Sequence, residues 1–179
     1  MASKLDFASL IRTIPDFPKP GVQFRDITTL LKDRDGFHDV IEALAAAQSG
    51  RGIDKIAGIE SRGFIVGAAL ACRLRVGFVP IRKRGKLPAE NFGEDYALEY
   101  GRDRLEMHRD AIDRGERVLL VDDLVATGGT AHAAVRLIAT AGGSLVGCAF
   151  VIDLPDLGGR RLLDSLGIPV QALCEFSGH

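Results

Sequence analysis

Amphipathic and apolar stretches alternate with short polar breaks along most of this chain. Apolar residues at helical spacing predict amphipathic helices, for example over residues 35–48. Residues 64–74 are apolar nearly all round, which predicts an inner helix. Together these patterns predict helices over residues 7–14, 35–48, 64–74, 102–113, 135–141 and 162–166.

Short apolar runs separate these helices and are typical of buried strands. Pro80, inside one run, indicates a strand end or a sheet edge. Buried strands that alternate with helices predict an α/β fold, with a mainly parallel sheet flanked by helices. Because no repeat or linker is visible, we expect residues 1–179 to form one domain. The strands are predicted at residues 56–59, 78–81, 118–121, 145–152 and 168–173.

One long interval between residues 81 and 118 interrupts this alternation. It is polar and contains glycines, and Tyr96, Leu98 and Tyr100 alternate near its middle. Long loops in compact domains are usually lids or binding loops, and otherwise they are disordered. The aromatic alternation favours a lid over residues 82–101, because it gives the returning limb side chains that can pack.

Composition narrows the class of protein. The chain has 23 Lys and Arg against 24 Asp and Glu, so its formal charge of -1 argues against nucleic-acid and membrane partners. The three cysteines are far apart in apolar surroundings, which indicates buried, reduced thiols. No signal-peptide core or membrane-length apolar run is present, so we expect a cytoplasmic protein. The four histidines share no metal-ligand spacing.

The most informative stretch is VLLVDDLVATGGTA, residues 118–131. Ligands of such sheets bind beyond the carboxyl ends of the strands, and here Asp122 and Asp123 stand where a strand is expected to stop. The glycines and threonines of residues 127–130 then precede a helix, an arrangement that favours a phosphate monoester. The carboxylates would repel that phosphate, so they suit vicinal hydroxyls or a magnesium ion instead.

The alternative for this stretch is an ordinary strand-to-helix turn with an Asp cap. The glycine pair alone favours that alternative, whereas the whole string favours a site for a ribose that carries a phosphate at its far end. The chain has no G-x-x-x-x-G-K-[ST] loop, and no G-x-G-x-x-G follows a strand. The pattern therefore supports neither a nucleoside triphosphatase nor a dinucleotide-binding protein.

Residues 118–131 closely resemble the phosphoribosyl pyrophosphate signature of the type I phosphoribosyltransferases. Residues 17–28, 58–64, 81–88 and 98–101 are similar, in the same order, to the adenine-using members of that family. After residue 131 the likeness is confined to a strand–helix–strand pattern. The resemblance implies transfer of the 5-phosphoribosyl group from phosphoribosyl pyrophosphate to adenine, which gives AMP and pyrophosphate in purine salvage. It also implies an N-terminal hood at about residues 1–34.

The resemblance assigns residues to each part of the reaction. Asp122 and Asp123 would bind the ribose hydroxyls, near the positive charge that develops on the sugar. Arg62 would hold pyrophosphate with its planar fork, in a loop for which the family implies a non-proline cis peptide. The 5-phosphate would be cradled by Ala126, Thr127, Gly128, Gly129 and Thr130. Pyrophosphate would be bound by Glu60, Ser61, Arg62, Arg82, Lys83 and Tyr100.

The base and the lid receive residues by the same resemblance. Adenine would lie in the hood, held largely by main-chain hydrogen bonds near Gln23, Phe24 and Arg25, with Leu124 as an opposite apolar wall. Glu99 matches the family residue proposed to assist proton movement on the purine. It therefore joins the catalytic candidates Arg62, Asp122 and Asp123.

The remaining implications concern the lid, the partner chain and the metal. Tyr100 would close over the site and help to exclude water from the sugar cation. Arg82 and Lys83 act partly across a dimer interface in the family, which implies a homodimer. Magnesium is expected together with phosphoribosyl pyrophosphate, held mainly by substrate oxygens and water rather than by direct protein ligands.

Two other functions remain open. A transferase for hypoxanthine, xanthine or orotate would keep the ribose-phosphate loop and change the hood and lid, and residues 17–28 count against it. A non-catalytic, nucleotide-sensing regulator would keep the loop but lose the lid or gain a nucleic-acid surface. Glu99, the intact lid and the near-neutral charge count against the regulator.

Overall fold

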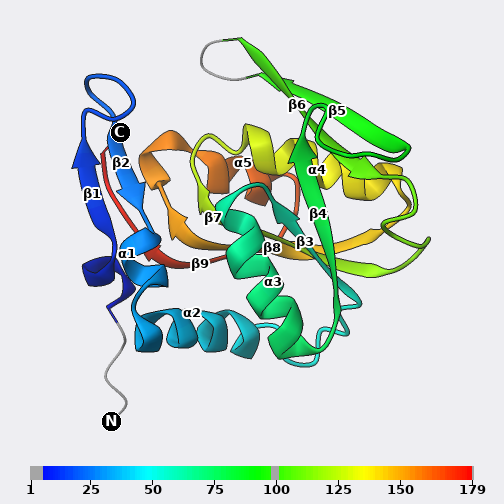
Figure 1. Ribbon diagram of the computed structural model, residues 1–179, viewed down its shortest axis with the longest axis horizontal. Coiled ribbons are helices and arrows are strands. Elements are labelled where there is room, and N and C mark those ends of the chain that lie inside the picture. Colours follow the sequence, from blue (N-terminus) through cyan, green and yellow to red (C-terminus); the bar gives the residue numbers. More distant parts are fainter. Residues whose placement is uncertain (1–5, 98–100, 179) are drawn as a thin grey trace.

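The computed structural model describes residues 6–97 and 101–178. In these residues the main sheet has seven strands in the order β5-β6-β4-β3-β7-β8-β9 (Figure 1). The pairs β3–β4, β3–β7, β7–β8 and β8–β9 are parallel, whereas β5 and β6 form an antiparallel hairpin on β4. The predicted α/β fold with a mainly parallel sheet is therefore confirmed.

The parallel strands and their flanking helices match the hydrophobic pattern closely. The parallel strands are β3 (Lys55–Ile59), β4 (Gly77–Lys83), β7 (Arg117–Val125), β8 (Ser144–Asp153) and β9 (Val170–Glu175). The helices that cover them are α2 (Arg34–Ala46), α3 (Arg62–Leu74), α4 (Gly129–Thr140) and α5 (Gly159–Ser165). A short 3-10 turn, η2 (Pro155–Leu157), connects β8 to α5.

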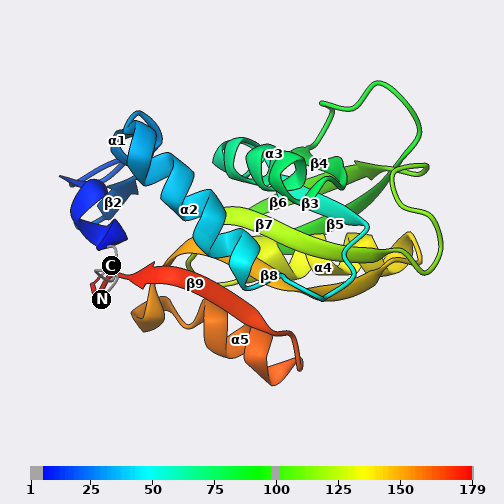
Figure 2. The same cartoon turned by 90° about the horizontal axis from the view of Figure 1, so that it is seen from below.

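Each face of the sheet has its own apolar core. Alternate residues of a strand point to opposite faces, so Leu119 packs toward α2 and α3 while Leu120 packs toward α4 and α5. Figure 2 shows α2 and α3 on one side of the sheet and α5 on the other. Both leucines are fully buried, which explains why this strand is a continuous apolar run in the sequence.

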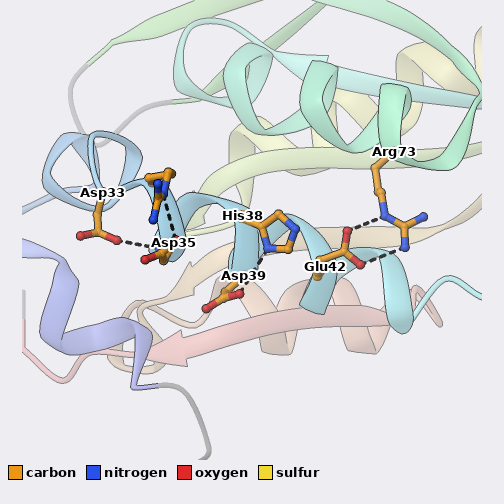
Figure 3. Close-up of polar contacts among 8 residues, drawn as sticks. Asp33, Asp35, His38, Asp39, Glu42 and Arg73 are labelled. Carbon is orange, nitrogen blue, oxygen red and sulfur yellow. Dashed lines mark hydrogen bonds and ion pairs between the residues drawn. The ribbon is translucent and has the colours of Figure 1, made fainter.

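Helix α2 begins at a side-chain cap, and an ion pair joins it to α3. The carboxylate of Asp33 accepts a hydrogen bond of 2.7 Å from the backbone N–H of Gly36. Near the other end, Glu42 forms a two-pronged ion pair with Arg73 of α3 (Figure 3). His38 and Asp39 contact each other on the exposed side of α2, so both side chains face solvent rather than the sheet.

The N-terminal segment forms a small separate layer. It contains a 3-10 turn, η1 (Phe7–Leu10), the antiparallel hairpin of β1 (Arg12–Pro15) and β2 (Gln23–Asp26), and helix α1 (Thr28–Leu31). The C-terminal residues after β9 end beside this hairpin (Figure 1). Arg25 of β2 donates a hydrogen bond of 3.0 Å to the carbonyl oxygen of Ser177, which joins the two ends of the chain.

Two helices predicted from the sequence are wrong. Residues 7–14 form η1 and then β1, because the backbone of Arg12–Pro15 pairs with β2 instead of continuing a helix. Residues 102–113 contain strand β6 (Arg102–His108), which pairs along its length with β5 (Asn91–Ala97). In both cases strand pairing outweighs the local pattern.

Three smaller expectations can also be compared with the structure. Pro80 lies inside β4 where only β3 is its partner, since β6 pairs with β4 at Arg82 and Lys83. All three cysteines are free, but Cys72 is exposed on α3, so the prediction of buried thiols is wrong for that residue. Among the described residues, no helix is long and apolar enough to cross a membrane.

Asp26 gives the N-terminal layer a pH-dependent contribution to stability. Hydrogen bonds from Arg12 and Thr28 lower the pKa of Asp26 from its usual 3.8 to about 2. A carboxyl with a lowered pKa in the folded state stabilises the protein above its usual pKa, and that contribution is lost as the pH falls toward 2. Arg12 is more than half exposed, so solvent screening reduces the effect.

We therefore expect Asp26→Asn to lower the free energy of unfolding by about 1–2 kcal/mol at pH 7. The difference from the wild type should shrink between pH 4 and pH 2. Urea unfolding at several pH values measures this difference, and a constant difference across that range would contradict the role of the Asp26 charge.

Candidate active site

A cavity of about 440 Å³ opens at the carboxyl ends of β3, β4 and β7. It extends from the start of α3 to the start of α4, with part of the β5–β6 hairpin on its rim. Its position agrees with the rule that ligands of such sheets bind beyond the strand ends. The cavity is lined by Ile59, Glu60, Ser61, Arg62, Lys83, Tyr96, Leu105, Asp122, Asp123, Leu124, Val125, Ala126, Thr127, Gly128, Thr130 and Ala131.

The two central carboxylates lie on an extension of β7. Strand β3 pairs with β7 only as far as Val121, whereas β8 continues to pair with β7 to Val125. Asp122 and Asp123 therefore have a strand on one side and the cavity on the other. The sequence predicted that the strand stops before Asp122, and this boundary is wrong because pairing with β8 carries β7 four residues further.

Arg62 joins the start of α3 to these carboxylates. Its Nε donates a hydrogen bond to Asp123, whose side chain is 5% exposed. Burial lowers the pKa of Arg62, but the charges of Asp123 and Asp122 outweigh burial and raise it above its usual value. Arg62 therefore stays charged while it neutralises part of the negative charge in the cavity wall.

Asp122 lies against the first turn of α3. A Cβ at Gly63 would come within 2.7 Å of Asp122 Oδ1, so only glycine allows this close approach. Burial and the negative charge of Asp123 raise the pKa of Asp122 well above its usual value. The carboxylate also accepts a hydrogen bond of 2.9 Å from the backbone N–H of Asp123.

The loop from Ala126 to Thr130 turns directly into α4. Gly128 has a φ of +86°, a conformation that favours glycine, and α4 begins at Gly129. The N–H groups in the first turn of a helix have no partner within that helix, so they are available to an anion. Gly129 itself is not part of the cavity lining, although the residues on both sides of it are.

The loop at the end of β3 contains a cis peptide bond between Glu60 and Ser61, which confirms the prediction of a non-proline cis bond there. The carboxylate of Glu60 accepts hydrogen bonds of 3.1 Å from Arg82 Nε and from the backbone N–H of Lys83. Lys83 lines the cavity, whereas Arg82 does not. The hydrogen bond from Arg82 therefore holds the side chain of Glu60, which does line the cavity.

Tyr96, which lines the cavity, and Asp103, which contacts two lining residues, were not among the site residues predicted from the sequence. Tyr96 lines the cavity and donates a hydrogen bond of 3.2 Å to Asp103, which also pairs with Lys83. Burial raises the pKa of Tyr96. A hydrogen bond with the side chain of Thr130 acts in the opposite direction and partly offsets this rise. The alternation near Tyr96 gave a signal for packing, but only the pairing of β5 with β6 brings Asp103 beside it.

Three of the four residues predicted to hold adenine, those in the hood, are not part of the cavity lining. Phe24 packs edge-on against Phe17 at 5.1 Å between ring centroids, and the guanidinium of Arg62 lies 5.4 Å from the Phe24 centroid. Gln23 and Arg25 flank Phe24 in β2, while Leu124 lines the cavity itself. The predicted residues Glu99 and Tyr100 lie outside the described residues.

Comparison with known proteins identifies the family. The family model of the phosphoribosyl transferase domain matches residues 27–163. The chain belongs to this family. The matched range contains the Arg62 loop, the paired carboxylates and the Ala126–Thr130 loop.

Individual phosphoribosyltransferases are similar over nearly their whole length. The adenine phosphoribosyltransferase of Methylobacillus flagellatus is 62% identical over 172 residues, which cover 96% of this chain and 98% of the relative. The structure of the enzyme from Rhodothermus marinus has a TM-score of 0.90 and 51% identity, over 95% of this chain and 96% of that chain. These matches confirm the predicted membership of the adenine phosphoribosyltransferases.

A third relative was solved with its ligands. The adenine phosphoribosyltransferase of Saccharomyces cerevisiae, complexed with adenine and an imino-altritol bisphosphate, has a TM-score of 0.88 and 40% identity. The alignment covers 95% of this chain and 97% of the yeast chain. The phosphoribosyltransferase fold of the present chain thus matches one that accommodates a purine base and a bisphosphate together.

The raised pKa of Asp122 predicts that the charged form of this carboxyl group destabilises the folded phosphoribosyltransferase. A carboxyl whose pKa is raised in the folded state holds its proton more tightly there, so stability falls as the pH rises above the usual carboxyl pKa. Asp122→Asn removes that charge and keeps the acceptor for the N–H of Asp123. We expect the variant to melt about 2–4 °C above the wild type at pH 7.

Calorimetry of the ligand-free protein at pH 4 and pH 7 measures this effect. The gain in melting temperature should be smaller at pH 4, where the wild-type carboxyl is more often protonated. A variant that melts below the wild type at pH 7 would show that the Asp122 charge is stabilising.

Proposed function

We propose that the chain transfers the 5-phosphoribosyl group from phosphoribosyl pyrophosphate to adenine, which gives AMP and pyrophosphate. The observation that carries this proposal is the arrangement of one cavity wall. A pair of carboxylates, Asp122 and Asp123, stands beside a helix start that is suited to a phosphate. A ribose 5-phosphate presents a diol to the carboxylates and a phosphate ester to the helix start. The similarity of this chain to adenine phosphoribosyltransferases supports adenine as the base.

In this proposal the carboxylates stabilise the sugar as its bond to pyrophosphate weakens. Asp122 and Asp123 accept hydrogen bonds from the ribose hydroxyls and place negative charge near the developing oxocarbenium ion. Fixed electrostatics of this kind and the orientation of the reactants supply most of the acceleration, and orientation alone can contribute about 7–11 kcal/mol. Residues 126–130 hold the 5-phosphate and so fix the sugar in place.

Arg62 and Lys83 receive the departing pyrophosphate. Within the described residues, the hydrogen bond from Arg62 to Asp123 uses Nε, which leaves the two Nη groups for phosphate oxygens. Ser61 and the start of α3 add backbone donors. Lys83 lies on the rim of the cavity, where Asp103 raises its pKa and keeps it charged.

The hood and the lid complete the site. We propose that Gln23, Phe24 and Arg25 hold adenine from the N-terminal layer, supported by the contact between Phe24 and Arg62. Glu99 then assists proton movement on the purine, and Tyr100 closes over the site with the rest of residues 82–101. Within this lid, Tyr96 contacts both Asp103 and Thr130, and so connects the lid to the Ala126–Thr130 loop, which we call the phosphate loop.

A magnesium ion fits this site as part of the substrate. The described residues contain no group of three or more His, Cys, Asp or Glu that could hold a metal. A magnesium ion is commonly bound through one or two carboxylates together with phosphate oxygens and water. Asp122 and Asp123 could approach such an ion, which would neutralise pyrophosphate as it leaves.

We further propose one domain over residues 1–179, a cytoplasmic location and a homodimer. The two cores share one sheet, which supports a single domain. Three free cysteines support a reducing compartment. Ile65 is 46% exposed beside the Arg62 loop, and Arg82 lies over Phe64, so this apolar surface next to the site supports contact with a second copy.

A single assay tests the reaction and the choice of base. The protein is incubated with magnesium and phosphoribosyl pyrophosphate together with adenine, hypoxanthine, xanthine or orotate. We expect AMP from adenine and much less nucleotide from the other bases, because a site built for the adenine amine leaves polar groups unpaired with an oxo-purine. Product from hypoxanthine alone would establish another base, and no product at all would favour a regulator.

Asp123→Asn tests the role of the carboxylate pair. The change removes the charge near the developing cation but keeps an acceptor for Arg62, so turnover should fall by about 10²-fold or more. Stability should change by no more than about 1–2 kcal/mol. Steady-state kinetics with adenine and thermal unfolding measure the two quantities.

The matched control for this test is Asp54→Asn. Asp54 lies before β3 at the opposite end of the sheet, where it accepts a hydrogen bond of 2.8 Å from the N–H of Arg117. The control should keep wild-type turnover. Equal turnover in folded Asp123→Asn and in the control would remove Asp123 from the mechanism.

A further inference from the structure

The segment that follows β8 touches the phosphate loop through its backbone. The N–H of Gly159 donates a hydrogen bond of 2.8 Å to the carbonyl oxygen of Ala126. Five residues earlier, directly after β8, the N–H of Leu154 donates a hydrogen bond of 3.1 Å to the carbonyl oxygen of Val125. The start of the loop is therefore joined to the region between β8 and α5, which is remote in the sequence.

Only glycine fits at the contact between this segment and the loop. A Cβ at Gly159 would lie 2.4 Å from the oxygen of Ala126 and 2.6 Å from the nitrogen of Gly128. In the opposite direction, a Cβ at Gly128 would lie 3.0 Å from the Cα of Gly159. These neighbours are backbone atoms, so no rotation of a side chain can relieve the overlap. One of the two backbones would have to move.

The conformation of Gly159 does not itself require glycine. Gly159 is the first residue of α5 and does not have the positive φ of Gly128 or Gly158. An alanine at this position would fit the helix, and its methyl group would press on the backbone of the loop and on the side chain of Val125 at the end of β7. Substitution at Gly159 therefore tests the contact without strain in its own backbone.

The helix that carries Gly159 is fixed to the sheet. Leu163 of α5 is fully buried in the apolar core that α5 shares with α4. The guanidinium of Arg160 lies 3.6 Å from the carboxylate of Asp153 at the end of β8 and 3.7 Å from Glu175 at the end of β9. Because α5 is fixed in this way, we expect an added methyl group at Gly159 to move the Ala126–Thr130 loop rather than the helix.

We infer that Gly159 is a positioning residue that sets the place of the Ala126–Thr130 loop for the 5-phosphate. The inference rests on the proposed function, because it requires the loop to bind that phosphate. The backbone N–H groups of an anion site must be held close to their productive geometry, and a support at van der Waals distance provides this. Gly159 acts through the loop and is not itself a ligand of the substrate.

Gly159→Ala tests this inference. The added methyl group should push the loop toward the cavity and raise the KM for phosphoribosyl pyrophosphate by about tenfold or more, since small displacements in a site have large effects. The KM for adenine should stay within about twofold, because the atoms nearest to the Cβ position of Gly159 belong to the loop and to Val125 rather than to the hood. Calorimetry with ribose 5-phosphate as the probe should show weaker binding to the ligand-free variant.

The matched control is Gly143→Ala, after the other end of α4. A Cβ there would lie 3.0 Å from Ile112 and Ile138, so it also crowds the core, but far from the loop. It should lower the melting temperature without changing either KM. A Gly159→Ala enzyme with the wild-type KM for phosphoribosyl pyrophosphate, or with both KM values raised alike, would overturn the inference.

A second variant covers failure of Gly159→Ala to fold. Leu162 of α5 approaches the loop, with its Cδ2 3.2 Å from the Cβ position of Gly128. Leu162→Ala should raise the KM for phosphoribosyl pyrophosphate selectively, by less than Gly159→Ala, and exposed Ser165→Ala is its control. An unchanged KM in Leu162→Ala would overturn the inference in that case, whereas an inactive wild type would instead overturn the proposed function.

Discussion

The site depends on one constraint, which is that β7 runs beyond β3 while it remains paired with β8. The unpaired side of the extension gives Asp122 and Asp123 a rigid strand for support and an open cavity to face. The same offset leaves room for the start of α3, from which Arg62 reaches Asp123. If β3 were four residues longer, its backbone would extend into the cavity.

Charge in the cavity is balanced but not cancelled. Two adjacent carboxylates repel each other, and burial raises the pKa of Asp122, so the ligand-free wall is electrostatically unfavourable. Arg62 compensates Asp123 through one nitrogen, and Lys83 is held at the rim by Asp103. A substrate that brings hydroxyls for the carboxylates and phosphates for the cations would satisfy both sets of groups at once. Unfavourable ligand-free charge of this kind is common at functional sites.

The last part of the chain contacts the site as well as completing the sheet. The turn before α5 is hydrogen-bonded to the start of the phosphate loop, and residues after β9 bind Arg25 in the N-terminal hairpin. Both contacts join segments that are distant in the sequence but adjacent at the carboxyl edge of the sheet. Residues without a motif of their own are therefore in direct contact with the site.

The sequence by itself determined the alternation of buried strands and helices, the sheet class and the motif around Asp122, because apolar period and local turn chemistry are properties of neighbouring residues. It also placed Arg62 and the Ala126–Thr130 loop, through residues that lie together in the chain. The tertiary structure alone decided the fate of Arg12–Pro15 and Arg102–His108, where pairing with a partner strand replaced the predicted helices. It alone revealed Asp103 beside Lys83 and Gly159 beneath Gly128, since contacts between distant segments have no period in the sequence and follow from the packing of the sheet.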